Sequence, residues 1–342
     1  MTLDDRKYMI LKAIIDDYIT TAVPVGSRTI SRKSGVGYSP ATIRNEMSDL
    51  EELGYLAQPH TSAGRIPSNK AYRLYVDRLV QVGGIQEEMK NRIDDYMHRK
   101  SRQVEDMIRT AASVLSDATQ YTSVIIAPQI HSLRIKRVQL VPVSDTTALM
   151  VIVTNAGIVK DAVIRVPEGI TAENLFRISE MLTNELSDHT LSEVRQIFAQ
   201  LFRDLSTHRR LLGGVMSAME EKLTEDAPED IVIGGASKML NHPEYSDVEK
   251  AKNVLSIFES RDRLMGLLKK TGGMEISIRI GPETGIEELN DCSLVTATYR
   301  VGNHAKGTLG IIGPTRMDYR RVITVMDYMG QVVSNLLSGE EI

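Results

Sequence analysis

Two short helical segments separated by a glycine-containing turn constrain the fold of this chain more than any other feature. The first, residues 27–30, is predicted to begin with Ser27 as its N-cap and to stop at Gly35, a residue type that commonly follows a helix. Ser39 and Pro40 then match an N-cap followed by proline at the first helical position, so the second helix is expected to run to about Leu53. Short helices joined by a tight turn, the second strongly capped, predict a helix-turn-helix.

The second of these helices has distinct inner and outer faces. Ile43, Met47 and Leu50 share one side of the helical wheel and are expected to face the core. The outer side and its flanks carry small, hydroxyl, amide and guanidinium groups, which can read base edges in DNA. The candidate DNA-binding residues here are Ala41, Thr42, Arg44, Asn45 and Ser48, with Arg28 on the preceding helix and Ser39 at the cap. A polar helix face alone is usually only solvated, so its neighbours decide between the two interpretations.

The segment that follows supplies that context. Residues 54–58 predict a short strand, residues 59–64 a polar turn, and residues 65–66 a return strand, after which Pro67 and Ser68 open another helix. This pattern is typical of the wing of a winged helix. We expect Arg65 near the wing tip, where a guanidinium can enter a minor groove or bind a phosphate. The other candidate phosphate ligands are Thr61, Ser62, Lys70 and Arg73.

The distribution of charge agrees with this location for a DNA-binding surface. The whole chain of 342 residues has a net charge of −4, which by itself argues against a nucleic-acid partner. Between Gly26 and Tyr75, however, seven Lys or Arg residues accompany only four acidic ones. The chain outside this segment is therefore the acidic part, and we expect a single monomer to bind DNA weakly.

These motifs resemble the heat-inducible transcription repressor family HrcA. Residues 39–47 (SPATIRNEM), residues 59–68 (PHTSAGRIPS) and the nearby Lys70, Ala71, Tyr72 and Arg73 carry the resemblance. It implies a homodimer that binds an inverted-repeat operator called CIRCE ahead of chaperone operons. It also implies that repression is lost on heat shock and that the GroEL chaperonin assists the active state. A small-molecule effector is not expected.

The remaining two thirds of the chain predict an α+β body. Helical patterns cover residues 86–120, 172–186, 191–205, 209–222 and 247–270. Strand patterns fall at residues 122–127, 134–143, 148–154, 158–166, 231–233, 274–280, 294–301 and 307–312, before a closing helix at 319–337. Strands on both sides of a helical block suggest one domain interrupted by another. The last strands and helix are similar to the end of a GAF domain, and the family resemblance implies the same architecture.

The expected fold class is therefore α+β and multidomain. We expect a winged helix-turn-helix at residues 1–82, a linker helix and the first part of a GAF-like domain at 83–170, an inserted helical dimerisation domain at 171–270, and the second part of the GAF-like domain at 271–342. The amino terminus lacks the pattern of a signal peptide, and no apolar stretch is long enough to span a membrane. A cytoplasmic protein is expected.

The sequence offers no group of residues that would support catalysis or hold a metal or cofactor. None of the seven histidines lies four residues from another, no Gly-x-Ser-x-Gly motif occurs, and the single Cys292 precedes an apolar strand and is expected to be a buried core thiol. We therefore expect a protein that is not an enzyme. Two alternatives remain: a ligand-sensing repressor, and a chaperone-bound adaptor that merely retains the winged helix.

Overall fold

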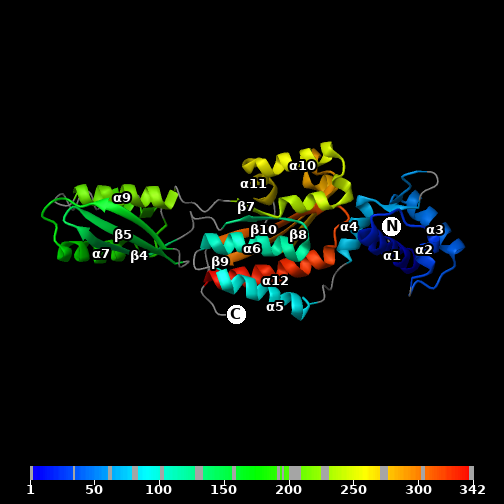
Figure 1. Ribbon diagram of the computed structural model, residues 1–342, viewed down its shortest axis with the longest axis horizontal. Coiled ribbons are helices and arrows are strands. Elements are labelled where there is room, and N and C mark those ends of the chain that lie inside the picture. Colours follow the sequence, from blue (N-terminus) through cyan, green and yellow to red (C-terminus); the bar gives the residue numbers. More distant parts are fainter. Residues whose placement is uncertain are drawn as a thin grey trace.

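Three bodies lie in a row in the computed structural model (Figure 1). The structure describes residues 3–33, 35–60, 64–78, 84–100, 104–127, 134–155, 159–190, 193–194, 196–199, 209–224, 231–269, 276–301 and 305–338. The amino-terminal module lies at one end, a sheet with helices on both faces lies in the middle, and a smaller sheet with helices lies at the other end. Within the described ranges, none of the helices combines the length and apolar character needed to cross a membrane.

The amino-terminal module consists of helices and one short ribbon, as its sequence predicts. Its elements are α1 (Asp5–Thr21), α2 (Ser27–Ser31), α3 (Pro40–Glu52), β1 (Leu56–Ala57), β2 (Ile66–Pro67) and α4 (Asn69–Asp77). The cap at Ser39 is confirmed, because its hydroxyl accepts a hydrogen bond from the Thr42 amide at 3.1 Å. The predicted cap at Ser27 is wrong: Gly26 is the N-cap and Ser27 is the first helical residue.

The ribbon of this module is tied to the chain between α1 and α2. Strands β1 and β2 are antiparallel, and the segment before β2 adds a bridge in which Val25 and Arg65 exchange two backbone hydrogen bonds of 2.9 Å. Gly64 lies directly against this bridge, because a Cβ at its position would stand 2.4 Å from the carbonyl oxygen of Val25. Only glycine fits at this crossing, since the obstacle is backbone.

Alanine at position 64 is expected to destabilise the amino-terminal module by about 1–3 kcal/mol, because overpacking against fixed backbone forces the ribbon away from Val25. Denaturant unfolding checks this value. Gly26→Ala is the matched control, since a Cβ there meets nothing within 4 Å, and it should cost about 1 kcal/mol or less. Equal stability of the two variants would show that the crossing is not tight.

The central body is a five-stranded antiparallel sheet between two layers of helices. Its strands, in spatial order, are β7 (Ile231–Gly234), β3 (Thr122–Ile126), β10 (Ala305–Pro314), β9 (Cys292–Val301) and β8 (Ile276–Ile280). One face packs against α6 (Val104–Thr119) and α12 (Tyr319–Ser338), with α5 (Glu87–Lys100) outside them, and the other against α10 (Val248–Glu259) and α11 (Arg261–Lys269). Two separate hydrophobic clusters therefore fill the two faces.

The third body interrupts the central sheet between β3 and β7. It contains β4 (Ile135–Ser144), β5 (Thr147–Thr154) and β6 (Val159–Arg165), with α7 (Ala172–Leu186) and α9 (Arg209–Thr224). These strands form their own three-stranded antiparallel sheet in the order β4-β5-β6, and the body has its own hydrophobic cluster.

The strands are confirmed in their positions but not in the division between domains that the sequence suggested. We expected the strands within residues 134–166 to share a sheet with the carboxy-terminal strands, and residues 171–270 to form the insertion. Instead, only β3 from that group joins the central sheet, and β7, α10 and α11 belong to the central body. Alternation of apolar residues indicates a strand and its buried face but carries no information about a distant partner.

Candidate nucleic-acid interface

Helix α3 presents an exposed polar face at the end of the molecule farthest from the third body (Figure 1). Ile43, Met47 and Leu50 are buried as predicted, and the side chains on the opposite face are exposed. The exposed candidates are Ala41, Arg44, Asn45 and Ser48. A helix of 13 residues is about 20 Å long, and an α-helix fits the major groove of B-DNA. The helix can therefore offer this face to several adjacent base pairs.

Two candidates at the start of α3 shape the helix. The Ser39 hydroxyl lies 2.9 Å from that of Thr42 and also accepts the Thr42 amide, and Thr42 is half-buried. These side chains thus fix the first turn. Arg28 on α2 is exposed, and α2 packs against α3, so this cation belongs to the same end of the module.

A buried acid that the sequence analysis missed holds α3 in place. Glu46 is buried and accepts ion pairs at 2.7 Å from both Arg6 and Lys7 of α1, and Lys7 also reaches Asp49 at 2.9 Å. A buried carboxylate is costly unless it is paired in this way. The same contacts raise the pKa of Lys7. On the helical wheel Glu46 lies beside the core positions of α3, and this position is the sequence signal that predicts its burial.

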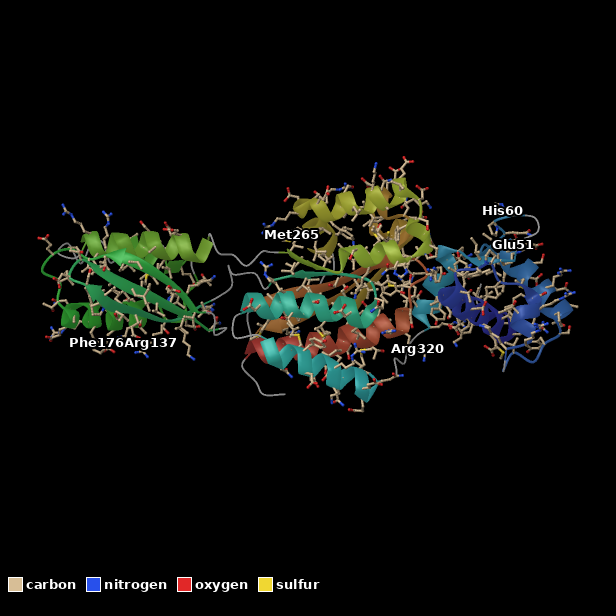
Figure 2. All side chains as sticks on the ribbon, viewed as in Figure 1. Glu51, His60, Arg137, Phe176, Met265 and Arg320 are labelled. Carbon is tan, nitrogen blue, oxygen red and sulfur yellow. The ribbon has the colours of Figure 1, made fainter. Side chains whose placement is uncertain are left out.

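The contacts of Arg65 within the protein were not predicted from the sequence. Arg65 directly precedes β2 on the turn side of the ribbon. Its backbone is bonded to Val25, and its guanidinium is 2.8 Å from Glu51 near the end of α3. The side chain is only 20% exposed. Arg65 therefore joins the ribbon to α3. Figure 2 shows His60 at the turn and Glu51 below it; the candidates Thr61 and Ser62 lie outside the described residues.

Lys70 and Arg73 both lie on α4 but have different surroundings. The Lys70 ammonium donates to the carbonyl of Leu53 at 2.8 Å and lies 4.4 Å from the ring centre of Tyr55. Arg73 instead donates to the carbonyl of Ile278 in β8 at 2.9 Å and pairs with Glu283 at 3.3 Å. The expectation that Arg73 extends the DNA-facing edge therefore does not match its position, because its guanidinium contacts the central body.

Lys70→Ala is expected to lower the stability of the module by about 0.5–1 kcal/mol, since a cation at a helix carboxyl end satisfies an otherwise unpaired carbonyl. If Lys70 also contacts a phosphate, the variant flattens the salt dependence of DNA binding by about one unit. Thermal unfolding and a salt titration of operator affinity measure the two effects separately. An unchanged melting temperature would contradict the structural contact.

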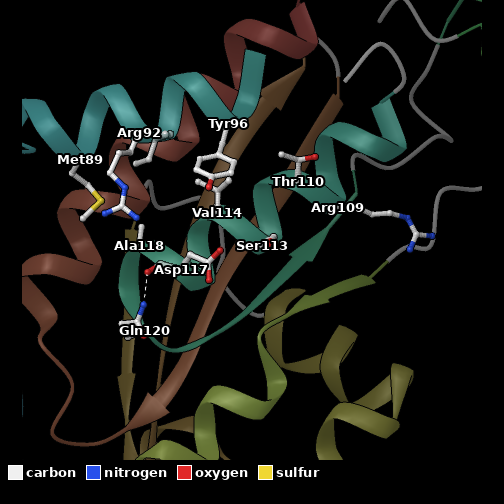
Figure 3. A pocket seen from close by; sticks show the side chains of 11 residues that line it. Met89, Arg92, Tyr96, Arg109, Thr110, Ser113, Val114, Asp117, Ala118 and Gln120 are labelled. Carbon is white, nitrogen blue, oxygen red and sulfur yellow. Dashed lines mark hydrogen bonds between the residues drawn. The ribbon is translucent and has the colours of Figure 1, made fainter. Parts of the chain in front are cut away.

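A groove of about 450 Å³ lies between α5 and α6 (Figure 3). Arg92 and Arg109 lie at opposite ends of it, with Tyr96 and Thr110 between them. The two cations therefore do not converge on one ligand atom. In the part of the chain that the structure describes, no three His, Cys, Asp or Glu side chains come together as a metal site.

The single thiol lies in the core and not in a reactive setting. Cys292 is buried, as predicted, and its sulfur is 3.1 Å from the Tyr245 hydroxyl. Burial raises the pKa of Cys292 to about 11, so the thiol is protonated at neutral pH. Such a thiol is a poor nucleophile.

The chain is similar to known proteins over nearly its whole length. The family model described as the HrcA protein C terminal domain matches residues 105–323. A relative from Ruminiclostridium cellulolyticum is 46% identical over 334 residues, covering 96% of each chain, and one from Brevibacillus brevis is 39% identical over 99% of each. A crystal structure described as that of a hypothetical protein aligns over 99% of both chains with a TM-score of 0.72 and 27% identity.

Both relatives are named heat-inducible transcription repressors. The class that these relatives define is therefore a transcriptional regulator. The chain belongs to the HrcA family.

Proposed function

We propose that this chain is a heat-inducible transcriptional repressor that reads an inverted-repeat operator with a winged helix-turn-helix. In this proposal α2 and α3 are the helix-turn-helix, the β1–β2 ribbon is the wing, and α3 enters the major groove. The observation that carries it is the exposed set Ala41, Arg44, Asn45 and Ser48 on a capped helix whose back is fixed to α1 by Glu46. A rigid helix with such side chains is suited to base recognition.

The exposed candidates divide into two chemical roles. Arg44 and Asn45 can each form two hydrogen bonds with one base, guanine and adenine respectively, whereas Ala41 can contact a thymine methyl group. Arg28 and Ser48 suit phosphate oxygens or base edges from the flanks. Thr61 and Ser62 remain proposed phosphate ligands of the wing, and Arg65 acts by holding the wing to α3 through Glu51.

We propose further that the repressor is a homodimer joined through the third body. One face of its sheet packs against the helices through residues such as Met150 and Ile152, which are buried. The opposite face carries Leu149, flanked in register by Val141 and Val163, which are 40% and 69% exposed. An exposed apolar row on a sheet marks a contact surface.

The β4 edge of this sheet is less suited to pairing than its open face. Helix α7 lies along β4, where the Thr183 hydroxyl bonds both backbone groups of Val138 and the Ser179 hydroxyl accepts the Leu140 amide at 2.8 Å. These side chains occupy hydrogen-bonding groups that a strand of a second copy would need. Association through the open face is therefore the favoured arrangement.

The central body is proposed to be a GAF-like scaffold without an effector. Its antiparallel sheet, with β9, β10 and α12 following one another at the carboxyl end, supports the GAF-like interpretation. The separation of Arg92 and Arg109 in the groove between α5 and α6 favours a scaffold over a ligand sensor.

Binding to an inverted repeat tests the proposed function directly. Purified protein is expected to shift a CIRCE-type operator from a chaperone operon at a concentration about 10³-fold lower than a scrambled duplex of equal composition. Equal binding to both duplexes would exclude sequence-specific recognition.

The proposed control by heat and by GroEL has its own measurement. Repressor heated and then cooled should recover operator binding more completely when GroEL is present, because a marginally stable protein that unfolds needs help to refold. Identical recovery with and without GroEL would remove the chaperonin from the proposal while leaving the operator test unaffected.

A further inference from the structure

The amino-terminal module is docked on the central body through buried contacts. Tyr72 of α4 and Tyr319 of α12 are both buried, with ring centres 6.1 Å apart. Asn69 of α4 lies against Gly281, because a Cβ at position 281 would stand 2.5 Å from the side-chain nitrogen of Asn69. One hydrophobic cluster runs through both parts, from Ile10 to residues of α12. Helix α3 thus belongs to a module that is packed against the central body.

A buried arginine fastens the first corner of this junction. Arg316, between β10 and α12, is buried and pairs through two nitrogens with Glu244 of η4 (Pro243–Tyr245). Its third nitrogen donates at 2.9 Å to the carbonyl of Ile19 in the last turn of α1. Carbonyls in the last turn of a helix lack a partner within the helix. Arg316 therefore supplies a missing bond to the amino-terminal module.

A second contact joins α4 to the central body. Arg73 of α4 donates to the carbonyl of Ile278 on β8, which is an edge strand of the central sheet. The Glu283 carboxylate accepts a hydrogen bond from the Ile280 amide at 2.9 Å, which positions it within the central body. It also accepts one from Arg73 of α4 at 3.3 Å. Arg316 thus reaches from the central body to α1, and Arg73 reaches from α4 to the central body.

We propose that Arg316 and Glu283 are positioning residues that set the spacing between the two half-sites of the operator. The inference rests on the proposed function, since it assumes a dimer that reads DNA with α3. Neither residue lies on the DNA-reading face. Both fix the direction in which that face points from the central body, and so fix the separation of two reading helices in a dimer.

The physical basis is the effective concentration of the second reading helix. After one helix binds its half-site, a rigid junction holds the other helix near one position, which favours one spacing strongly. A loosened junction spreads that helix over many positions. Affinity for the natural spacing then falls, and the penalty for an altered spacing becomes smaller, while a single half-site is bound as before.

The test compares three duplexes: a single half-site, the natural operator, and the operator with about five base pairs inserted between half-sites, which is half a helical turn. The variants are Arg316→Met and the milder Glu283→Ala. Glu288→Ala is the matched control, because Glu288 accepts from Arg263 within the central body at 2.6 Å and has similar exposure, 33% against 41%. Fluorescence anisotropy gives the affinities.

For wild type and the control, the affinity for the natural operator is expected to exceed that for the lengthened operator by about 100-fold or more. For Glu283→Ala and Arg316→Met the same ratio is expected to be about tenfold or less. Half-site affinity should stay within about twofold for the folded variants. If Arg316→Met does not fold, Glu283→Ala alone decides. Unchanged spacing preference in Glu283→Ala, or loss of its half-site binding, would overturn the inference. Absence of any operator preference in wild type would instead refute the proposed function.

Discussion

Aspartate in place of Val163 is expected to separate the proposed dimer and to lower operator affinity by about 100-fold or more. Val163 is 69% exposed on the open face of the third body's sheet, next to Leu149. A charge at this position would have to leave water if two such faces met, which is unfavourable without a partner. A monomer then loses the gain of about 10²–10⁴ that linked binding of two half-sites provides.

Analytical ultracentrifugation gives the mass, and anisotropy with a half-site and a full operator gives the affinities. The half-site affinity should not change, because α3 lies in another body. Val248→Asp is the matched control, since Val248 is 66% exposed and lies on α10 of the central body. A dimeric Val163→Asp protein with wild-type operator affinity would mean that the copies associate elsewhere.

Alanine in place of Arg44 is expected to weaken operator binding by at least about tenfold while leaving the fold intact. Arg44 is exposed on α3, so its loss should change stability by no more than about 0.5 kcal/mol. A side chain that forms two hydrogen bonds with one base contributes about 1–3 kcal/mol to discrimination, and a dimer carries two copies. The loss should concentrate on operators that keep one particular base pair in each half-site.

The control for this substitution is Arg177→Ala in α7, which removes another exposed arginine, one that pairs with Glu173. It changes the net charge by the same amount but is far from α3. Comparing operator with scrambled DNA separates recognition from general attraction. If Arg44→Ala and Arg177→Ala bind the operator alike, Arg44 is not a reading residue.

Local signals in the sequence were sufficient to locate most of the elements and the outer face of α3. Ser39 with Pro40 fixed the start of α3 through a cap whose partner lies three residues away. Ile43, Met47 and Leu50 fixed its inner face through helical periodicity. These features depend on residues within one or two helical turns of each other, so they can be predicted from the sequence alone.

What could not be predicted depends on contacts between distant residues. Arg65 was expected at a free wing tip but pairs with Glu51, and Arg73 was expected to face DNA but bonds Ile278, which is 205 positions away. Likewise, nothing near β4 indicates that the sheet it forms with β5 is separate from the central sheet. Side chains of one charge look alike in sequence, and only the fold decides which of them have an internal partner.

The central claim is that two copies of α3 lie in major grooves on one face of an inverted repeat. Methylation interference at guanine N7, which lies in the major groove, measures this most directly. The account predicts two symmetric clusters of interference, one in each half-site and separated by a whole number of helical turns, about 10–10.5 base pairs each. A single unsymmetric cluster, or no interference at a duplex that the protein binds, would contradict it.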